Sequence, residues 1–134
     1  MLRLTKTKMV AMLLIATTLV MFNGVSAFAE QKPLAVGSKS VYISSNAYQY
    51  YADASTSGAE PNSGISCTIT NSHYIAVHKD TGVVYQEDKG PVTQVNSVSV
   101  SFYAPTDYKT SSISTVHSAY YIGYTNSGNT ADSY

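Results

Sequence analysis

Tyrosine is the residue type whose spacing most suggests a binding site. Tyr48, Tyr50 and Tyr51 fall within four residues, and Tyr120 and Tyr121 form a second pair. Successive side chains of a strand point to opposite faces, so each group leaves at least one ring at the surface or rim. Such rings offer a large contact area with few rotatable bonds, and they stack well on sugar faces. We predict that these five tyrosines bind a ligand; the alternative is that they only favour strands.

Histidine could supply a metal site, because imidazole binds zinc and copper. The chain has three histidines: His73, His78 and His117. His73 and His78 are five residues apart, so on one continuous strand they point to opposite faces. We therefore expect no metal and no other cofactor. A mixed site of His73, His117 and an acid is the remaining alternative.

Patterns that mark catalysis are missing from the chain. There is no G-x-S-x-G motif, no phosphate-binding loop, no zinc spacing and no calcium loop. Glu87 and Asp88 are adjacent, so their carboxylates face apart at the end of a strand. We therefore expect no catalytic residues and a protein that is not an enzyme, with a small secreted hydrolase as an alternative.

The single cysteine, Cys67, excludes a disulfide within the chain. It alternates with Ile65 and Ile69, which predicts a buried small apolar side chain. A reactive thiol or an intermolecular bridge is the alternative.

The start of the chain has the order of a secretory signal. Three basic residues precede an uncharged stretch over 9–29, which ends in Ala27-Phe28-Ala29. Small residues at these positions fit a signal peptidase, so we expect cleavage before Glu30. Cleavage after Ala27, or an uncleaved membrane anchor, is the alternative.

The predicted domains are a signal peptide over 1–29 and one extracellular domain over 30–134, secreted by a bacterium. The predicted extracellular domain carries five lysines, no arginine and eight acidic residues, which gives a net charge of minus three. Such a surface binds nucleic acid poorly, and it binds anionic membranes equally poorly. We expect no nucleic acid as a partner, and no membrane after the signal is cleaved. A cell-wall glycan, another polysaccharide or an extracellular protein fits better.

Composition predicts an all-β fold. After the signal, leucine occurs once, at Leu34, whereas valine, isoleucine, threonine and all twelve tyrosines favour strands. We expect a single small antiparallel sandwich or barrel of about six to eight strands. Periodicity places the strands at 39–45, 47–54, 65–77, 83–87, 92–104 and 111–124.

Local patterns add further expectations. Over 65–77 the apolar residues share one register, with Asn71-Ser72 as a candidate turn or bulge. Gly82 predicts a hairpin turn, and 88–91 predicts another turn. We also expect a long loop over 55–64, a bulge near Thr115, a turn over 126–129 and a frayed tail.

These observations favour a secreted, non-enzymatic binding or surface-interaction module with a tyrosine-rich β-face. A secreted antagonist is the alternative, either a bacteriocin-like toxin or an inhibitor that presents the loop over 55–64 to an extracellular hydrolase.

Overall fold

The computed structural model describes residues 31–134, and the predicted signal and its cleavage point lie outside these residues. The described chain is all-β, with two antiparallel sheets and no helix. The nine strands are β1 (Lys32–Val36), β2 (Lys39–Ala47), β3 (Tyr51–Gly58), β4 (Ser66–His78), β5 (Val84–Lys89), β6 (Val92–Val95), β7 (Ser97–Tyr103), β8 (Tyr108–Tyr121) and β9 (Tyr124–Ser133). The six strands placed by periodicity become nine because 92–104 forms two strands and because β1 and β9 lie where no strand was expected.

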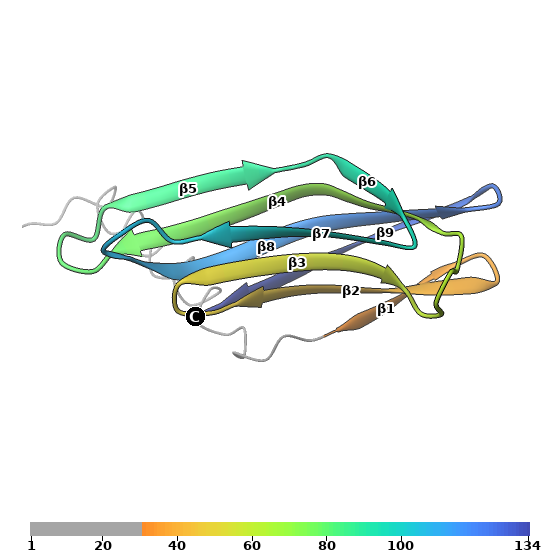
Figure 1. The fold of residues 1–134 in the computed structure, drawn as a ribbon, viewed down its shortest axis with the longest axis horizontal. Helices are drawn as coiled ribbons and strands as arrows, with labels where there is room; N and C mark the ends of the chain where they lie inside the picture. Colours follow the sequence, from red (N-terminus) through yellow and green to blue (C-terminus); the bar gives the residue numbers. More distant parts are fainter. Residues whose placement is uncertain (1–30) are drawn as a thin grey trace, which may run out of the picture.

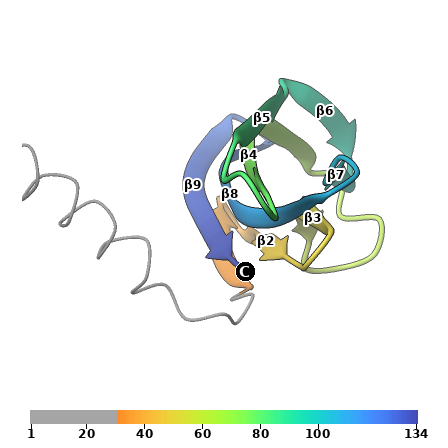
Figure 2. The same ribbon diagram turned by 90° about the vertical axis from the view of Figure 1, so that its left-hand side faces the viewer.

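The two sheets pack face to face in a sandwich-like arrangement. One has the order β1-β2-β3-β7; the other has the order β5-β4-β8-β9, with β6 also paired to β4. Seen along the strands, the sheets curve around a common interior (Figure 2). That interior holds the core, whose larger members are Ile43, Phe102, Ile65, Ile69, Tyr74 and Ile113. Burial of Cys67 in this core is confirmed, and desolvation raises the pKa of its thiol.

A bulge in β4 reverses the inward face of the strand. The register against β8 shifts between Ile69 and Asn71, which leaves Thr70 as the extra residue. Cys67 and Ile69 face inward before it, and Tyr74 faces inward after it. The expectation of one register over 65–77 is therefore wrong beyond Ile69, although the irregularity lies where Asn71 suggested it.

The predicted turn over 88–91 is not a reversal of the chain. β5 pairs with the second half of β4 and β6 with the first half, so the chain continues along the same neighbour. Gly90 lies at the break, with φ of 125°. The predicted hairpin at Gly82 is confirmed: His78 N–H donates to the Val83 carbonyl at 2.9 Å, and Gly82 has φ of 71°.

The predicted strand over 92–104 is two strands in two sheets. Asn96 has φ of 72° and separates β6 from β7. Within β7 the alternation is as expected, with Val98, Val100 and Phe102 buried between exposed serines. β7 therefore carries the chain from one sheet to the other (Figure 1).

The predicted strand over 47–54 is also divided. Ala47 ends β2, and Tyr48 to Tyr50 form the turn into β3, closed by Tyr48 N–H donating to the Tyr51 carbonyl at 2.8 Å. β3 then continues to Gly58, so the long loop expected over 55–64 begins only after that residue. The tyrosines were predicted to lie in a strand because aromatic residues favour strands. That preference is weak, and the requirement for a turn outweighs it here.

β8 and β9 form a long hairpin. The bulge expected near Thr115 is wrong: the register of β8 shifts at Ser111 instead, and the inward face downstream is Ile113, Thr115, His117 and Ala119. The turn expected over 126–129 and the frayed tail are also wrong, because β9 pairs with β8 from Tyr124 to Ser133. Residues 31–134 contain no helix of the length and hydropathy needed to cross a membrane.

Candidate binding site

Three exposed tyrosines meet at one end of the four-stranded sheet. Tyr48 stacks on Tyr51 with ring centroids 4.3 Å apart, and Tyr51 lies 6.5 Å from Tyr103. Tyr48 and Tyr51 are each 41 % exposed, and Tyr103 is 71 % exposed. We call these three residues the tyrosine cluster. It presents a row of exposed aromatic surface.

Strand register brings the tyrosine cluster together. Tyr51 begins β3 and is the direct cross-strand partner of Tyr103 at the end of β7. Their neighbours Ala52 and Phe102 are buried, so alternation turns both tyrosine rings outward. Partial desolvation, together with the nearby carboxylate of Asp53, raises the pKa of Tyr48. At neutral pH its phenol is therefore uncharged and able to donate a hydrogen bond.

The outer face of the same sheet is rich in hydroxyls. Ser55 and Ser57 on β3 are cross-strand partners of Ser99 and Ser97 on β7. Ser55 also pairs with Ser44 of β2, with the two Oγ atoms 2.9 Å apart. The outer face of the sheet next to the tyrosine cluster is thus covered by small polar side chains. Alternate residues of one strand are about 6.7 Å apart, and neighbouring strands are about 4.8 Å apart.

The five tyrosines predicted as a site do not converge. Tyr48 and Tyr51 lie in the tyrosine cluster, and Tyr50 lies near it, with Lys79 Nζ 4.9 Å from its ring centroid. Tyr120 and Tyr121 lie at the opposite end of the sandwich, where β8 ends (Figure 1). Tyr103 was missed: the alternation of β7 predicted its outward direction, but its pairing with Tyr51 depends on strand order.

The histidines lie in three separate environments. His73 Nδ1 is 2.8 Å from Asp88 Oδ1 at the surface. His78 accepts hydrogen bonds from the backbone of Asp80 and Thr81 in the β4–β5 hairpin. His117 is fully buried. Over residues 31–134, no three His, Cys, Asp or Glu side chains come close enough to hold a metal ion.

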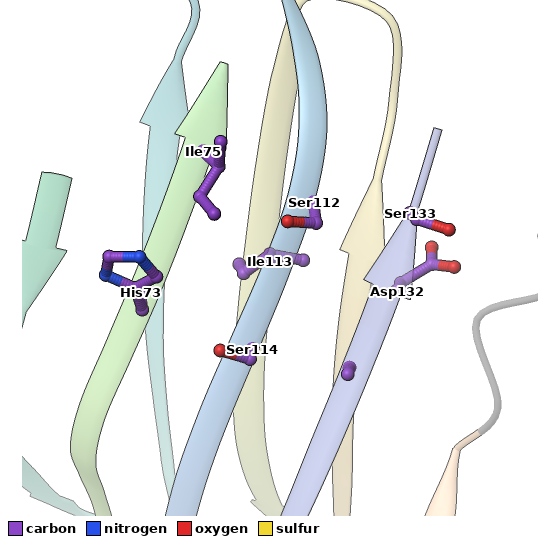
Figure 3. A pocket seen from close by; sticks show the side chains of 8 residues that line it. His73, Ile75, Ser112, Ile113, Ser114, Asp132 and Ser133 are labelled. Atoms are coloured by element: carbon purple, nitrogen blue, oxygen red, sulfur yellow. The ribbon is translucent and has the colours of Figure 1, made fainter. Parts of the chain in front are cut away.

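Three neighbouring surface residues resemble the Ser-His-Asp arrangement of hydrolases. Asp88, His73 and Ser114 are cross-strand neighbours on β5, β4 and β8. His73 and Ser114 line a groove of about 80 Å³ on the outer face of their sheet (Figure 3). Acyl transfer also needs free N–H donors to hold the oxyanion. Ser114 is paired with β4 on one side and β9 on the other, so the sheet occupies the surrounding amides. This geometry does not favour hydrolysis.

His117 belongs to a buried hydrogen-bond network between the sheets. Its Nδ1 is 2.8 Å from the Thr56 hydroxyl, and its Nε2 is 2.6 Å from the Thr130 hydroxyl. Desolvation lowers the pKa of His117 to about 4, so the ring is neutral at physiological pH. Sequence periodicity missed this network because a polar residue at an inward position looks like a surface residue.

The network continues from Thr130 through Ser45. The Ser45 hydroxyl lies 2.5 Å from Thr130 Oγ1 and donates to Thr115 Oγ1 at 3.0 Å. Since Ser45 has one hydroxyl proton, Thr130 must donate to Ser45, and His117 Nε2–H must donate to Thr130. His117 Nδ1 then accepts from Thr56. The neutral ring is thus fixed as the Nε2–H tautomer.

Comparison with known proteins gives no match: no protein-family model, curated protein or solved structure is significantly similar to the chain. Function must therefore be inferred from the surfaces described above.

Proposed function

We propose that this chain is a secreted, non-enzymatic binding module whose tyrosine cluster holds a neutral glycan, either in bacterial cell wall or in another insoluble polysaccharide. The observation that carries the proposal is the contact among Tyr48, Tyr51 and Tyr103, which are all exposed. Exposed large apolar groups that gather in one place are more informative than scattered ones. These three rings offer one continuous aromatic surface.

The chemistry around the tyrosine cluster suits a polyol. The C–H face of a sugar ring packs on an aromatic ring, while its hydroxyls need polar partners. Ser99 and Ser101 precede Tyr103 on the outer face of β7, and Asp53 comes two residues after Tyr51 on β3. Two lysines lie near this end, Lys79 beside the Tyr50 ring and Lys89 beside the Phe102 ring, and the carboxylate of Asp53 lies near Tyr48. A neutral, hydroxyl-rich ligand matches this surface better than a polyanion.

Replacing Tyr51 or Tyr103 with alanine should weaken retention on insoluble peptidoglycan or cellulose by roughly 1 to 3 kcal/mol per ring, the scale of aromatic anchors at interfaces. The ring supplies most of the contact area, so its loss removes the stacking partner of the sugar. Retention is measured by co-sedimentation of the purified protein with each polymer.

Tyr42→Ala is the matched control, because Tyr42 is exposed on the same sheet but pairs with Ser57, away from the tyrosine cluster. It should be retained like the parent. Each variant must keep the parent's thermal transition. Equal retention of all three variants would reduce the tyrosines to strand and turn formers, and binding of an extracellular protein without any polysaccharide would change the ligand class.

Export of the chain is tested separately. Because Ala27-Phe28-Ala29 follows an uncharged stretch, N-terminal sequencing of protein from culture supernatant should begin at Glu30. Recovery of the intact chain from the membrane fraction alone would rule out a released protein.

A further inference from the structure

The turn between β8 and β9 has an unfavourable residue at its tip. Ile122 and Gly123 connect the strands with φ of 44° and 78°, both in the left-handed region. Two-residue hairpin turns of this kind favour Asn-Gly, because asparagine and glycine tolerate positive φ. A β-branched residue there is an outlier. The Ile122 side chain is nevertheless 71 % exposed, so packing within the protein does not explain it.

Two tyrosines flank Ile122 at the same end of the molecule. Tyr120 is 51 % exposed and Tyr124 is 61 % exposed. The Tyr124 ring lies on Gly37 in the β1–β2 turn, where an added Cβ would come within 2.7 Å of the ring. Both turns project at one end of the long axis (Figure 1). We call Tyr120, Ile122 and Tyr124 the hairpin tip.

The part of the β8–β9 hairpin that lies between Lys109 and Asp132, with the tip at its centre, is uncharged. From Thr110 to Ala131 the sequence contains no Asp, Glu, Lys or Arg. Its one histidine, His117, is buried and neutral. The nearby Lys39 has its Nζ 4.4 Å from the centroid of the Tyr121 ring and donates to the Ser63 carbonyl. An uncharged occupant is therefore the electrostatic match for the hairpin tip.

We propose that the hairpin tip is an anchor that inserts Ile122 into the interface of a bilayer with uncharged or zwitterionic headgroups. Tyrosine rings are stable at headgroup depth, with the ring in the apolar layer and the hydroxyl in water. Three side chains on a convex turn are too small for a stable protein interface, which buries about 800 Å² on each partner. A shallow interfacial anchor needs no more than such a tip.

This proposal goes beyond the proposed glycan binding and is independent of it. It also revises one expectation from composition. The net charge of minus three argued against anionic membranes, but it leaves a zwitterionic surface open. Asp80 and Asp107 lie in turns at the opposite end of the sandwich. Glu60 lies in the loop between β3 and β4, where it lines a cavity together with Lys39, so the end that carries the hairpin tip has charges of both signs.

The test is sedimentation of the purified secreted protein with phosphatidylcholine vesicles. The parent should co-sediment, and Ile122→Asn should reduce its apparent affinity at least fivefold. The same variant should melt at an equal or higher temperature than the parent, because asparagine is favoured at positive φ. A loss of binding together with retained or improved stability separates an anchor residue from a structural one.

Val83→Asn is the matched control, since Val83 is an exposed aliphatic side chain in the hairpin at the opposite end. It should bind vesicles like the parent, as should Tyr51→Ala, which tests the tyrosine cluster instead. The proposal is overturned if the parent stays in the supernatant at every lipid concentration, if Ile122→Asn binds as well as the parent, or if binding requires anionic lipid.

Discussion

Replacing His117 with leucine should lower the free energy of unfolding by about 2 to 4 kcal/mol at pH 8. Leucine fills a similar volume but offers no hydrogen bond to Thr56 or Thr130. Thr130 keeps Ser45 as a partner, whereas Thr56 is left with the Thr68 carbonyl at 3.5 Å. The loss is therefore expected mainly from the buried Thr56 hydroxyl and from imperfect packing. Denaturant unfolding of both proteins measures it.

The same substitution should change how stability depends on pH. The pKa of His117 is about 4 in the folded protein, against an ordinary 6.5, so between these values the unfolded chain binds more protons than the native one. The parent therefore loses stability as pH falls from 6.5 towards 4, by about 3 kcal/mol from this residue. His117→Leu lacks this loss, and the stability gap between the two proteins should narrow by that amount.

The carboxylates titrate in both proteins, so they cancel when the two stability curves are subtracted. A gap that stays constant from pH 8 to pH 4 would mean that His117 is protonated in the folded state without cost. That outcome would contradict the desolvation that the burial of His117 implies.

Gly90→Ala is expected to destabilise the protein by about 2 to 4 kcal/mol. Gly90 has φ of 125°, which side chains of L-residues rarely allow. An added Cβ would also lie 2.7 Å from the Thr70 carbonyl oxygen and 3.0 Å from that of Ile69. Both are backbone atoms at the β4 bulge, so they cannot move without disturbing the register that orients Tyr74 inward.

Gly82→Ala is the control for backbone conformation alone. Gly82 has φ of 71°, but an added Cβ meets no atom within 4 Å. Gly82→Ala should lower the free energy of unfolding by about 1 kcal/mol, which is the cost of the left-handed conformation for a residue with a side chain. Thermal or urea unfolding compares the two, and equal losses would show that the close approach of Gly90 to β4 has no energetic weight.

The parts of the fold that could be predicted are those whose inward residues are apolar. Val98, Val100 and Phe102 alternate with serines, and the inward face of β7 was predicted correctly for that reason, although its separation from β6 was not. Cys67 between Ile65 and Ile69 was likewise placed in the core. The Gly82 hairpin followed from the need for positive φ at a tight turn.

The parts that could not be predicted have polar residues facing inward. In β9 the buried positions are Thr130 and Asp132, and the residue opposite His117 is Gly128, so the strand looks like a turn and a solvated tail. Thr130 contacts Ser45 and His117, and Asp132 Oδ2 accepts from the Ala47 amide at 2.8 Å. Only the partner strands make these positions recognisable as buried.

The candidate site shows the same limit. Tyrosine content pointed to aromatic surfaces, but the tyrosine cluster needs the turn at Tyr48 and the pairing of Tyr51 with Tyr103. Such long-range pairing depends on strand order, which one sequence does not show. At the hairpin tip, Ile122 was taken for a strand residue of 111–124, and its positive φ only becomes visible in the structure.

The position of β9 has a consequence for the order in which the chain folds. β9 connects the two sheets: Asn126 donates to the Ala35 carbonyl of β1, and Thr130 and Asp132 contact β2. The interior next to the first strands is therefore complete only after residues 124–133 have paired. Non-local pairing of this kind is slow and delays compaction. A nascent chain would remain open until late in its synthesis, which is the state that the proposed export through a narrow translocation channel would require.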